Sequence, residues 1–76
     1  MIDRKKFSER LKELRARDGI TIIQLAAAVD LSKQSINNFE NLRNLPSVDK
    51  LDALADYFNV TTDYLLGRTN RKRADE

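Results

Sequence analysis

The stretch TIIQLAAAVDLSKQSINNFEN, residues 21–41, contains two short helical patterns with a tight connection between them. Thr21 lies three residues before Gln24 and forms with it the sequence of a capping box, which marks the start of a helix. We expect this first helix to occupy about residues 22–29. Ser32 is a favourable N-cap for a second helix that reaches the end of the quoted stretch. The stretch therefore predicts two helices joined by a turn of only a few residues.

The sequence on either side predicts three further helices and no strand. Apolar side chains recur at helical spacing before the quoted stretch and predict a helix over about residues 3–18, which Gly19 ends. After it, Ser47 caps a fourth helix, and Thr61 caps a final turn that Gly67 closes. The apolar positions expected to face inward are Phe7, Leu11, Leu14, Leu25, Ala26, Val29, Ile36, Phe39, Val48, Leu51, Leu54, Ala55 and Phe58.

Size and composition fit one small globular domain. The chain has 76 residues, of which 41% are hydrophobic and 34% charged, so it is too apolar for a disordered segment. We therefore predict an all-α fold, a compact five-helix bundle in residues 1–67. No apolar run reaches the roughly 20 residues of a membrane span, and no signal peptide is recognisable, so a cytoplasmic protein is expected.

The residue types that the chain lacks narrow its chemistry. It has no cysteine and no histidine, which excludes disulfides and the usual zinc ligands. Its carboxylates are scattered over polar helix faces, and no serine has an obvious base partner. Its two glycines lie far apart, so no phosphate-cradling loop is expected. We expect no metal, no cofactor, no small-molecule ligand and no enzymatic activity.

The net charge of +2 lies entirely in the C-terminal segment, residues 68–76. Basic side chains outnumber acidic ones there, whereas the charges of residues 1–67 balance. The segment has no apolar periodicity, so we expect a mobile tail that is dispensable for folding. The basic side chains of this tail are Arg68, Arg71, Lys72 and Arg73.

The second helix of the quoted stretch has a polar face suited to nucleic acid. Small Ala26 allows the two helices to approach closely, and Ile36 fills the angle between them, which projects the start of the second helix outward. Lysine can donate to guanine, whereas glutamine and asparagine can pair with adenine. The alternative is an ordinary solvated face of a small bundle. The outward side chains are Lys33, Gln34, Ser35, Asn37 and Asn38.

From Phe7 to about Thr69 the chain resembles the lambda-type repressor and Cro family, also called the Xre family. The matching text is RLKELRARDGIT, then QLAAAVDLSKQSINNFE, then LPSVDKLDALADYFNVTTDYLLGRT. The last segment resembles phage and chromosomal repressors of Gram-positive bacteria. The resemblance implies a helix-turn-helix regulator of transcription, expected to be a repressor. Its expected partner is a double-stranded, palindromic DNA operator, bound as a homodimer.

The resemblance also implies roles for particular residues. Arg15 and Glu40 match a characteristic pair in which an arginine of the first helix bonds the acid that ends the recognition helix. Glu40 is then structural, although it is the only acid between Leu31 and Val48. The residues at the family's base-reading positions are Lys33, Gln34 and Asn38, and those near its phosphate contacts are Thr21, Asn41, Arg43 and Asn44.

Three positions depart from the family's pattern. Ile22 replaces a glutamine that donates to a DNA phosphate, Asp30 replaces the glycine of the turn, and Leu42 replaces a glycine after the recognition helix. Aspartate enters left-handed geometry more readily than most residues, so Asp30 is tolerable. Ile22, Ile23 and Leu42 are either scattered surface residues or part of a patch that binds a protein partner. The second possibility leaves open an interaction module on the same fold, antitoxin-like or docked to another regulator.

Overall fold

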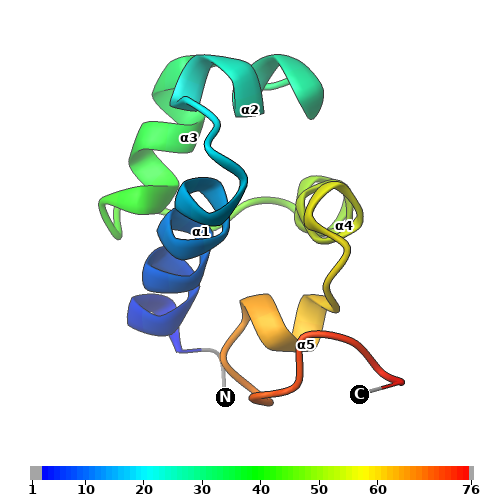
Figure 1. Ribbon diagram of the computed structural model, residues 1–76. Helices are drawn as coiled ribbons and strands as arrows, with labels where there is room; N and C mark the ends of the chain where they lie inside the picture. Colours follow the sequence, from blue (N-terminus) through cyan, green and yellow to red (C-terminus); the bar gives the residue numbers. More distant parts are fainter. Residues whose placement is uncertain (1–2, 76) are drawn as a thin grey trace.

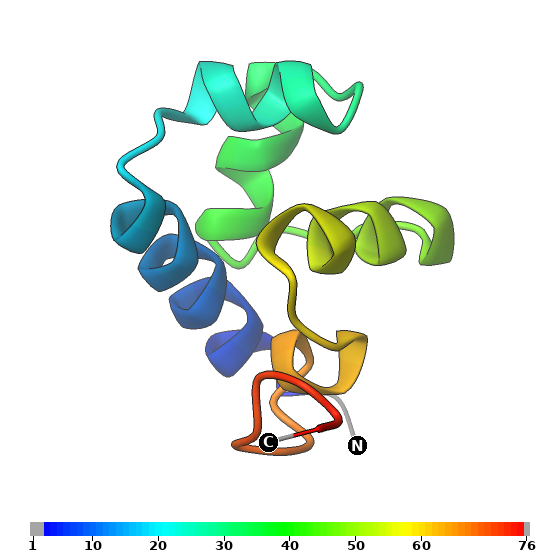
Figure 2. The ribbon, with the colours of Figure 1, turned by 45° about the vertical axis from the view of Figure 1, so that its right-hand side comes forward.

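The computed structural model describes residues 3–75, which form an all-helical bundle as expected (Figure 1). Residues 1 and 2 of the predicted domain and residue 76 of the predicted tail lie outside this range. Figures 1 and 2 place α2 at one end of the molecule and α5 at the other, with α1 and α4 between them. The five helices are α1 (Arg4–Asp18), α2 (Ile22–Ala28), α3 (Lys33–Glu40), α4 (Val48–Phe58) and α5 (Thr62–Leu65).

Each helix begins at a residue whose side chain accepts a hydrogen bond from a backbone N–H of the first turn. This bond satisfies one of the donors that the start of a helix leaves unpaired. The capping box predicted between Thr21 and Gln24 is present, with both of its reciprocal bonds. The structure adds one cap that the sequence reasoning did not identify, at Asp3. The capping residues are Asp3, Thr21, Ser32, Ser47 and Thr61.

All five helices end in the same way, with one residue in the left-handed region followed by a closing hydrogen bond. After α3, for example, Leu42 has φ 64°, its N–H donates to Phe39 O, and the N–H of Arg43 donates to Asn38 O. This is a Schellman motif, which usually has glycine at the left-handed position. Only two of the five positions are glycine here. The left-handed residues are Gly19, Asp30, Leu42, Asn59 and Gly67.

The buried core matches the predicted apolar positions with one correction. Val48 was expected to face inward, but it is 82% exposed. It is the first residue of α4, which begins at the outer edge of the molecule, beyond the core (Figure 2). Burial on α4 starts later, with Leu51 partly buried and Leu54 fully buried. The helical spacing was correct, but the pattern could not indicate how far α4 extends past its neighbours.

Arg10 of α1 fastens the chain where it leaves α5. Its guanidinium lies over the ring of Tyr64, at 4.2 Å from the ring centroid, and donates to Tyr64 O. The same group donates to Thr69 O at 2.6 Å and to Asn70 Oδ1 at 2.9 Å. Arg10 therefore joins the N-terminal helix to the first residues of the basic tail.

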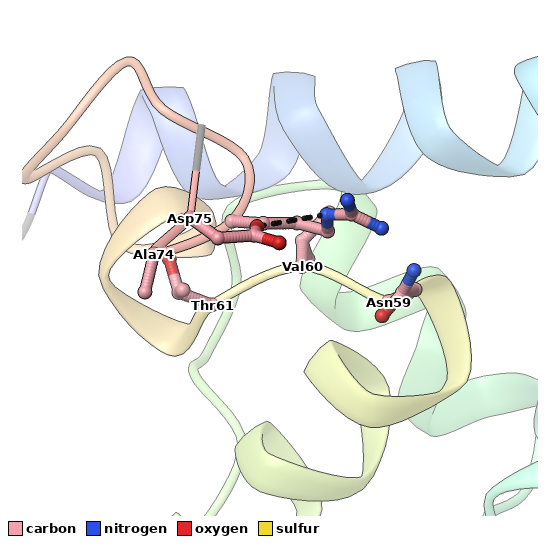
Figure 3. Close-up of a pocket in the computed structure, with 6 residues that line it drawn as sticks. Asn59, Val60, Thr61, Ala74 and Asp75 are labelled. Carbon is pink, nitrogen blue, oxygen red and sulfur yellow. Dashed lines mark ion pairs between the residues drawn. The ribbon is translucent and has the colours of Figure 1, made fainter.

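Residues 70–75 then fold back along the connection between α4 and α5. The N–H of Thr61, which caps α5, donates to Lys72 O at 2.7 Å. Figure 3 shows Ala74 and Asp75 beside Val60 and Thr61, with Asp75 in an ion pair with Arg73. The described tail is thus in contact with the bundle, a feature that its lack of periodicity did not predict. The mobility of the tail stays a prediction. The expectation that the tail is dispensable for folding is also untested, and its contacts with Arg10 and Thr61 favour the opposite outcome.

Candidate nucleic-acid interface

Close packing between α2 and α3, and hydrogen bonds from a lysine of α4, hold these two helices together. Ala26 and Ile36 are buried between the helices, as expected for a close approach. Asp30 takes the left-handed conformation, φ 56°, at the position where the resemblance implied a glycine. Lys50 of α4 donates from Nζ to Val29 O at 3.1 Å and to Asp30 O at 3.3 Å. The lysine satisfies carbonyls at the end of α2 and holds the turn against α4.

The exposed face of α3 is lined with side-chain amides. Ile36 and Phe39 are buried, and about 3.6 residues per turn places the opposite face near Gln34, Asn38 and Asn41. We call Gln34, Asn37, Asn38 and Asn41 the amide row. Its members are exposed or partly exposed, and they form two pairs four residues apart, Gln34 with Asn38 and Asn37 with Asn41. Such a face offers hydrogen-bond donors and acceptors without any charge.

Two side-chain hydrogen bonds join the members of the amide row in pairs. Gln34 Nε2 donates to Asn38 Oδ1 at 2.9 Å, and Asn41 Nδ2 donates to Asn37 Oδ1 at 3.1 Å. Residues four apart lie next to each other on a helix surface, which explains both bonds. Asn41 was expected near a phosphate, and the structure gives it this second role. All four amides of the row are therefore paired with one another on the surface of α3.

The other predicted base-reading residues differ in their availability. Lys33 is exposed at the first position of α3. Ser35 is only partly exposed, and its hydroxyl lies 3.0 Å from the hydroxyl of Ser32, the N-cap of the helix. Ser35 thus belongs to the capping network, which leaves its hydroxyl less available for a ligand than the amides beside it.

The predicted phosphate-contact residues lie on the surface at the two ends of the helix pair. Thr21 Oγ1 accepts from the N–H of Gln24, and its hydroxyl hydrogen can still be donated elsewhere. Arg43 and Asn44 are exposed in the loop that follows α3. Asn41 is exposed at the end of that helix. Their positions are compatible with contacts on both sides of the amide row.

Arg15 and Glu40 form a bidentate pair between α1 and the end of α3. Arg15 Nε donates to Glu40 Oε2 at 2.8 Å, and Arg15 Nη2 donates to Glu40 Oε1 at 3.0 Å. The hydrogen bond to Glu40 raises the pKa of the Arg15 guanidinium, against the opposing effect of burial, so the arginine stays charged. Ser8 donates to Glu40 O at 2.6 Å. This is the pairing that the resemblance implied, and it ties the end of α3 to α1.

The apolar residues considered for a partner-binding patch do not share one environment. Ile22 is partly buried and packs against the core, whereas Ile23 is 62% exposed and Leu42 is 49% exposed. Leu42 lines a groove together with α1, whose charged side chains there are Lys5, Glu9 and Lys12. Ile22 is therefore a core residue in part, which the sequence pattern did not reveal.

Two negative findings concern the part of the chain that the structure describes. Within residues 3–75, no group of three or more potential acidic, histidine or cysteine ligands could hold a metal ion. None of the described helices has the length and hydrophobicity that a membrane span requires.

Comparison with known proteins identifies the same helical unit. Residues 11–65 match a family model described as Helix-turn-helix. The HTH-type transcriptional regulator YobD of Bacillus subtilis is 36% identical over 64 residues, which are 84% of this chain and 57% of YobD. The HTH-type transcriptional regulator ImmR of the same organism is 34% identical over 68 residues, which are 90% of this chain and 54% of ImmR. The chain thus spans about half the length of these relatives.

A solved structure agrees with the sequence comparison. The SOS-response transcriptional repressor LexA from Eubacterium rectale superposes with a TM-score of 0.77 and 32% sequence identity. The match covers 87% of this chain and 72% of the LexA chain. The five-helix arrangement is therefore the lambda repressor-like fold, with α2 and α3 as its helix-turn-helix.

Proposed function

The chain belongs to the helix-turn-helix family, and we propose that it binds double-stranded DNA in a sequence-specific way and represses transcription. The observation that supports this proposal is the amide row on the exposed face of α3. A helix of this kind fits the major groove, where base edges present donors and acceptors to it. We propose that Lys33, Gln34, Asn37 and Asn38 contact base edges.

Phosphate contacts would position this helix on the duplex. Thr21 lies at the start of α2, and Asn41 lies at the end of α3. Arg43 and Asn44 follow in the loop after α3. Donors on both sides of a recognition helix fix its register on the DNA backbone, although they read no sequence. We propose that these four residues have this role.

We further propose that the operator is palindromic and that a homodimer binds it. One helix of eight residues reaches only a few base pairs, so specificity requires two half-sites about 10 base pairs apart. We assign the chain no enzymatic activity, because the relatives found are regulators of transcription. Its DNA target would place it in the cytoplasm, on the nucleoid.

Titration of DNA duplexes tests this proposal. A sequence selected from a random pool should bind at least about 1,000-fold more tightly than random duplexes, and binding should weaken steeply with salt. Gln34→Ala should reduce specific binding by about 1–3 kcal/mol and relax the preference at one base pair. Equal weakening on every duplex would instead reassign Gln34 to backbone positioning.

The second candidate function is a protein-interaction module on the same fold. The exposed side chains of Ile23 and Leu42 favour it, because each presents apolar surface to solvent. A chain with this function would bind no duplex selectively, and its association with a partner would depend little on salt. The salt titration therefore separates the two candidates.

A further inference from the structure

The two hydrogen-bonded pairs of the amide row restrict what each amide can offer to a base. A side-chain amide has two N–H donors and one oxygen with two lone pairs. Gln34 uses one N–H to bond Asn38, and Asn37 uses its oxygen to accept from Asn41. The unused atoms of each side chain then form a defined pattern.

Gln34 keeps the pattern that matches adenine. One N–H of Nε2 is donated to Asn38 Oδ1, which leaves the other N–H and the whole of Oε1. Adenine presents an acceptor at N7 and a donor at N6 in the major groove, so the remaining fork of Gln34 can bond both. Guanine presents two acceptors there, and Oε1 would face one of them without a hydrogen between them.

Asn38 and Asn37 keep a different pattern, since each uses one lone pair of its oxygen within the row and neither uses an N–H there. Both retain two N–H donors that can be directed outward. Donors match the acceptors of guanine, O6 and N7, or O4 of thymine. Asn38 is one helical turn from Gln34, about 6 Å along the axis, and base pairs are about 3.4 Å apart, so the two side chains reach different base pairs.

We propose that Asn38 acts as a positioning residue that fixes the amide of Gln34 for adenine, while Asn38 and Asn37 select guanine or thymine beside it. This inference rests on the proposed DNA binding. Without Asn38, the terminal amide of Gln34 can flip by about 180°, which places its N–H donors where its oxygen was. The preference for adenine then falls, although Gln34 itself is unchanged.

Selection of bound sequences from a random duplex pool tests this inference. Comparison of the wild type with Gln34→Ala identifies the base pair that Gln34 reads. We expect adenine there, preferred over guanine by about tenfold or more. Asn38→Ala should reduce this preference about fivefold, since ordering one long side chain has that magnitude. Loss of the direct contacts of Asn38 would change the preference at the base pair that Asn38 itself contacts, whereas only loss of its positioning role would change the preference at the Gln34 base pair.

Two further variants separate positioning from general damage. Asn38→Asp keeps the acceptor oxygen, so it should keep the adenine preference while its charge weakens binding to all duplexes. Asn37→Ala is the matched control, because it removes an amide of the other pair and should change the preference at the Gln34 base pair less than about twofold. Circular dichroism establishes that each variant is folded.

The outcomes distinguish this inference from the proposed function. Two outcomes would overturn the inference alone, provided that the wild type binds duplexes selectively. One is a preference for guanine at the Gln34 base pair, and the other is an adenine preference that Asn38→Ala leaves unchanged. A wild-type chain that selects no sequence would overturn the proposed function and the inference together. A reduced adenine preference in Asn38→Ala that Asn38→Asp restores would support both.

Discussion

Replacing Arg15 by methionine should destabilise the fold more than any change on the surface of α1. Methionine retains the packing of the aliphatic stem but removes both hydrogen bonds to Glu40. The side chain of Glu40 is only 6% exposed, so its carboxylate would stay buried without a partner. Breaking a buried pair in this way costs about 3–5 kcal/mol. A domain of this size has only about 4–11 kcal/mol of stability in total, so much of it would be lost.

The reverse replacement, Glu40→Leu, should cost less, about 2–3 kcal/mol. The Arg15 side chain is 24% exposed, and its guanidinium also donates to Ile20 O at 3.2 Å. Water can therefore reach part of the charge that this variant leaves unpaired. The two single replacements are unequal because the two partners are buried to different depths.

Urea unfolding followed by circular dichroism measures these differences in a double-mutant cycle. Arg15→Met combined with Glu40→Leu should cost at least about 2 kcal/mol less than the sum of the single changes. Lys12→Met, on an exposed position of the same helix, is the control and should change stability by less than about 0.5 kcal/mol. Additive single effects, or a loss below about 1 kcal/mol for Arg15→Met, would refute the reasoning from burial.

Three further predictions follow from other positions. Leu42→Gly should raise the free energy of unfolding by about 0.5–1 kcal/mol, because relief of left-handed strain exceeds the entropy that glycine costs; a lower melting temperature would show that the contacts of Leu42 matter more. Ile22→Gln should tighten binding to specific and random duplexes alike by about 0.5–1.5 kcal/mol through a new phosphate bond; unchanged affinity with an altered sedimentation coefficient would point to a protein contact instead. Ending the chain at Gly67 removes acceptors from Arg10 and Thr61, so the thermal midpoint should fall by about 4–8 °C; an unchanged midpoint would support a dispensable tail.

Local sequence determined the starts of the helices and most of the candidate interface. The predicted caps at Thr21, Ser32, Ser47 and Thr61 are all present, since each bond joins residues only three apart. The polar face of α3 was also predictable, because helical periodicity alone separates it from Ile36 and Phe39. The resemblance added the pair of Arg15 and Glu40, which residue chemistry alone had not indicated.

The sequence could not indicate which distant groups meet. Lys50 bonds carbonyls at the end of α2, and Arg10 bonds Thr69, although each pair is separated by 20 residues or more. The chain has 14 lysines and arginines, and nothing in their spacing distinguishes these two from solvated ones.

Tertiary structure also decided burial and backbone strain at single positions. Val48 satisfies the periodicity of α4 and is nevertheless exposed, because no neighbouring element covers the start of that helix. Leu42 adopts a conformation that glycine would enter without strain. Cap chemistry and periodicity act over a few residues and can be recognised in the sequence. Exposure and strain depend on where the other helices lie, which only packing of the whole chain determines.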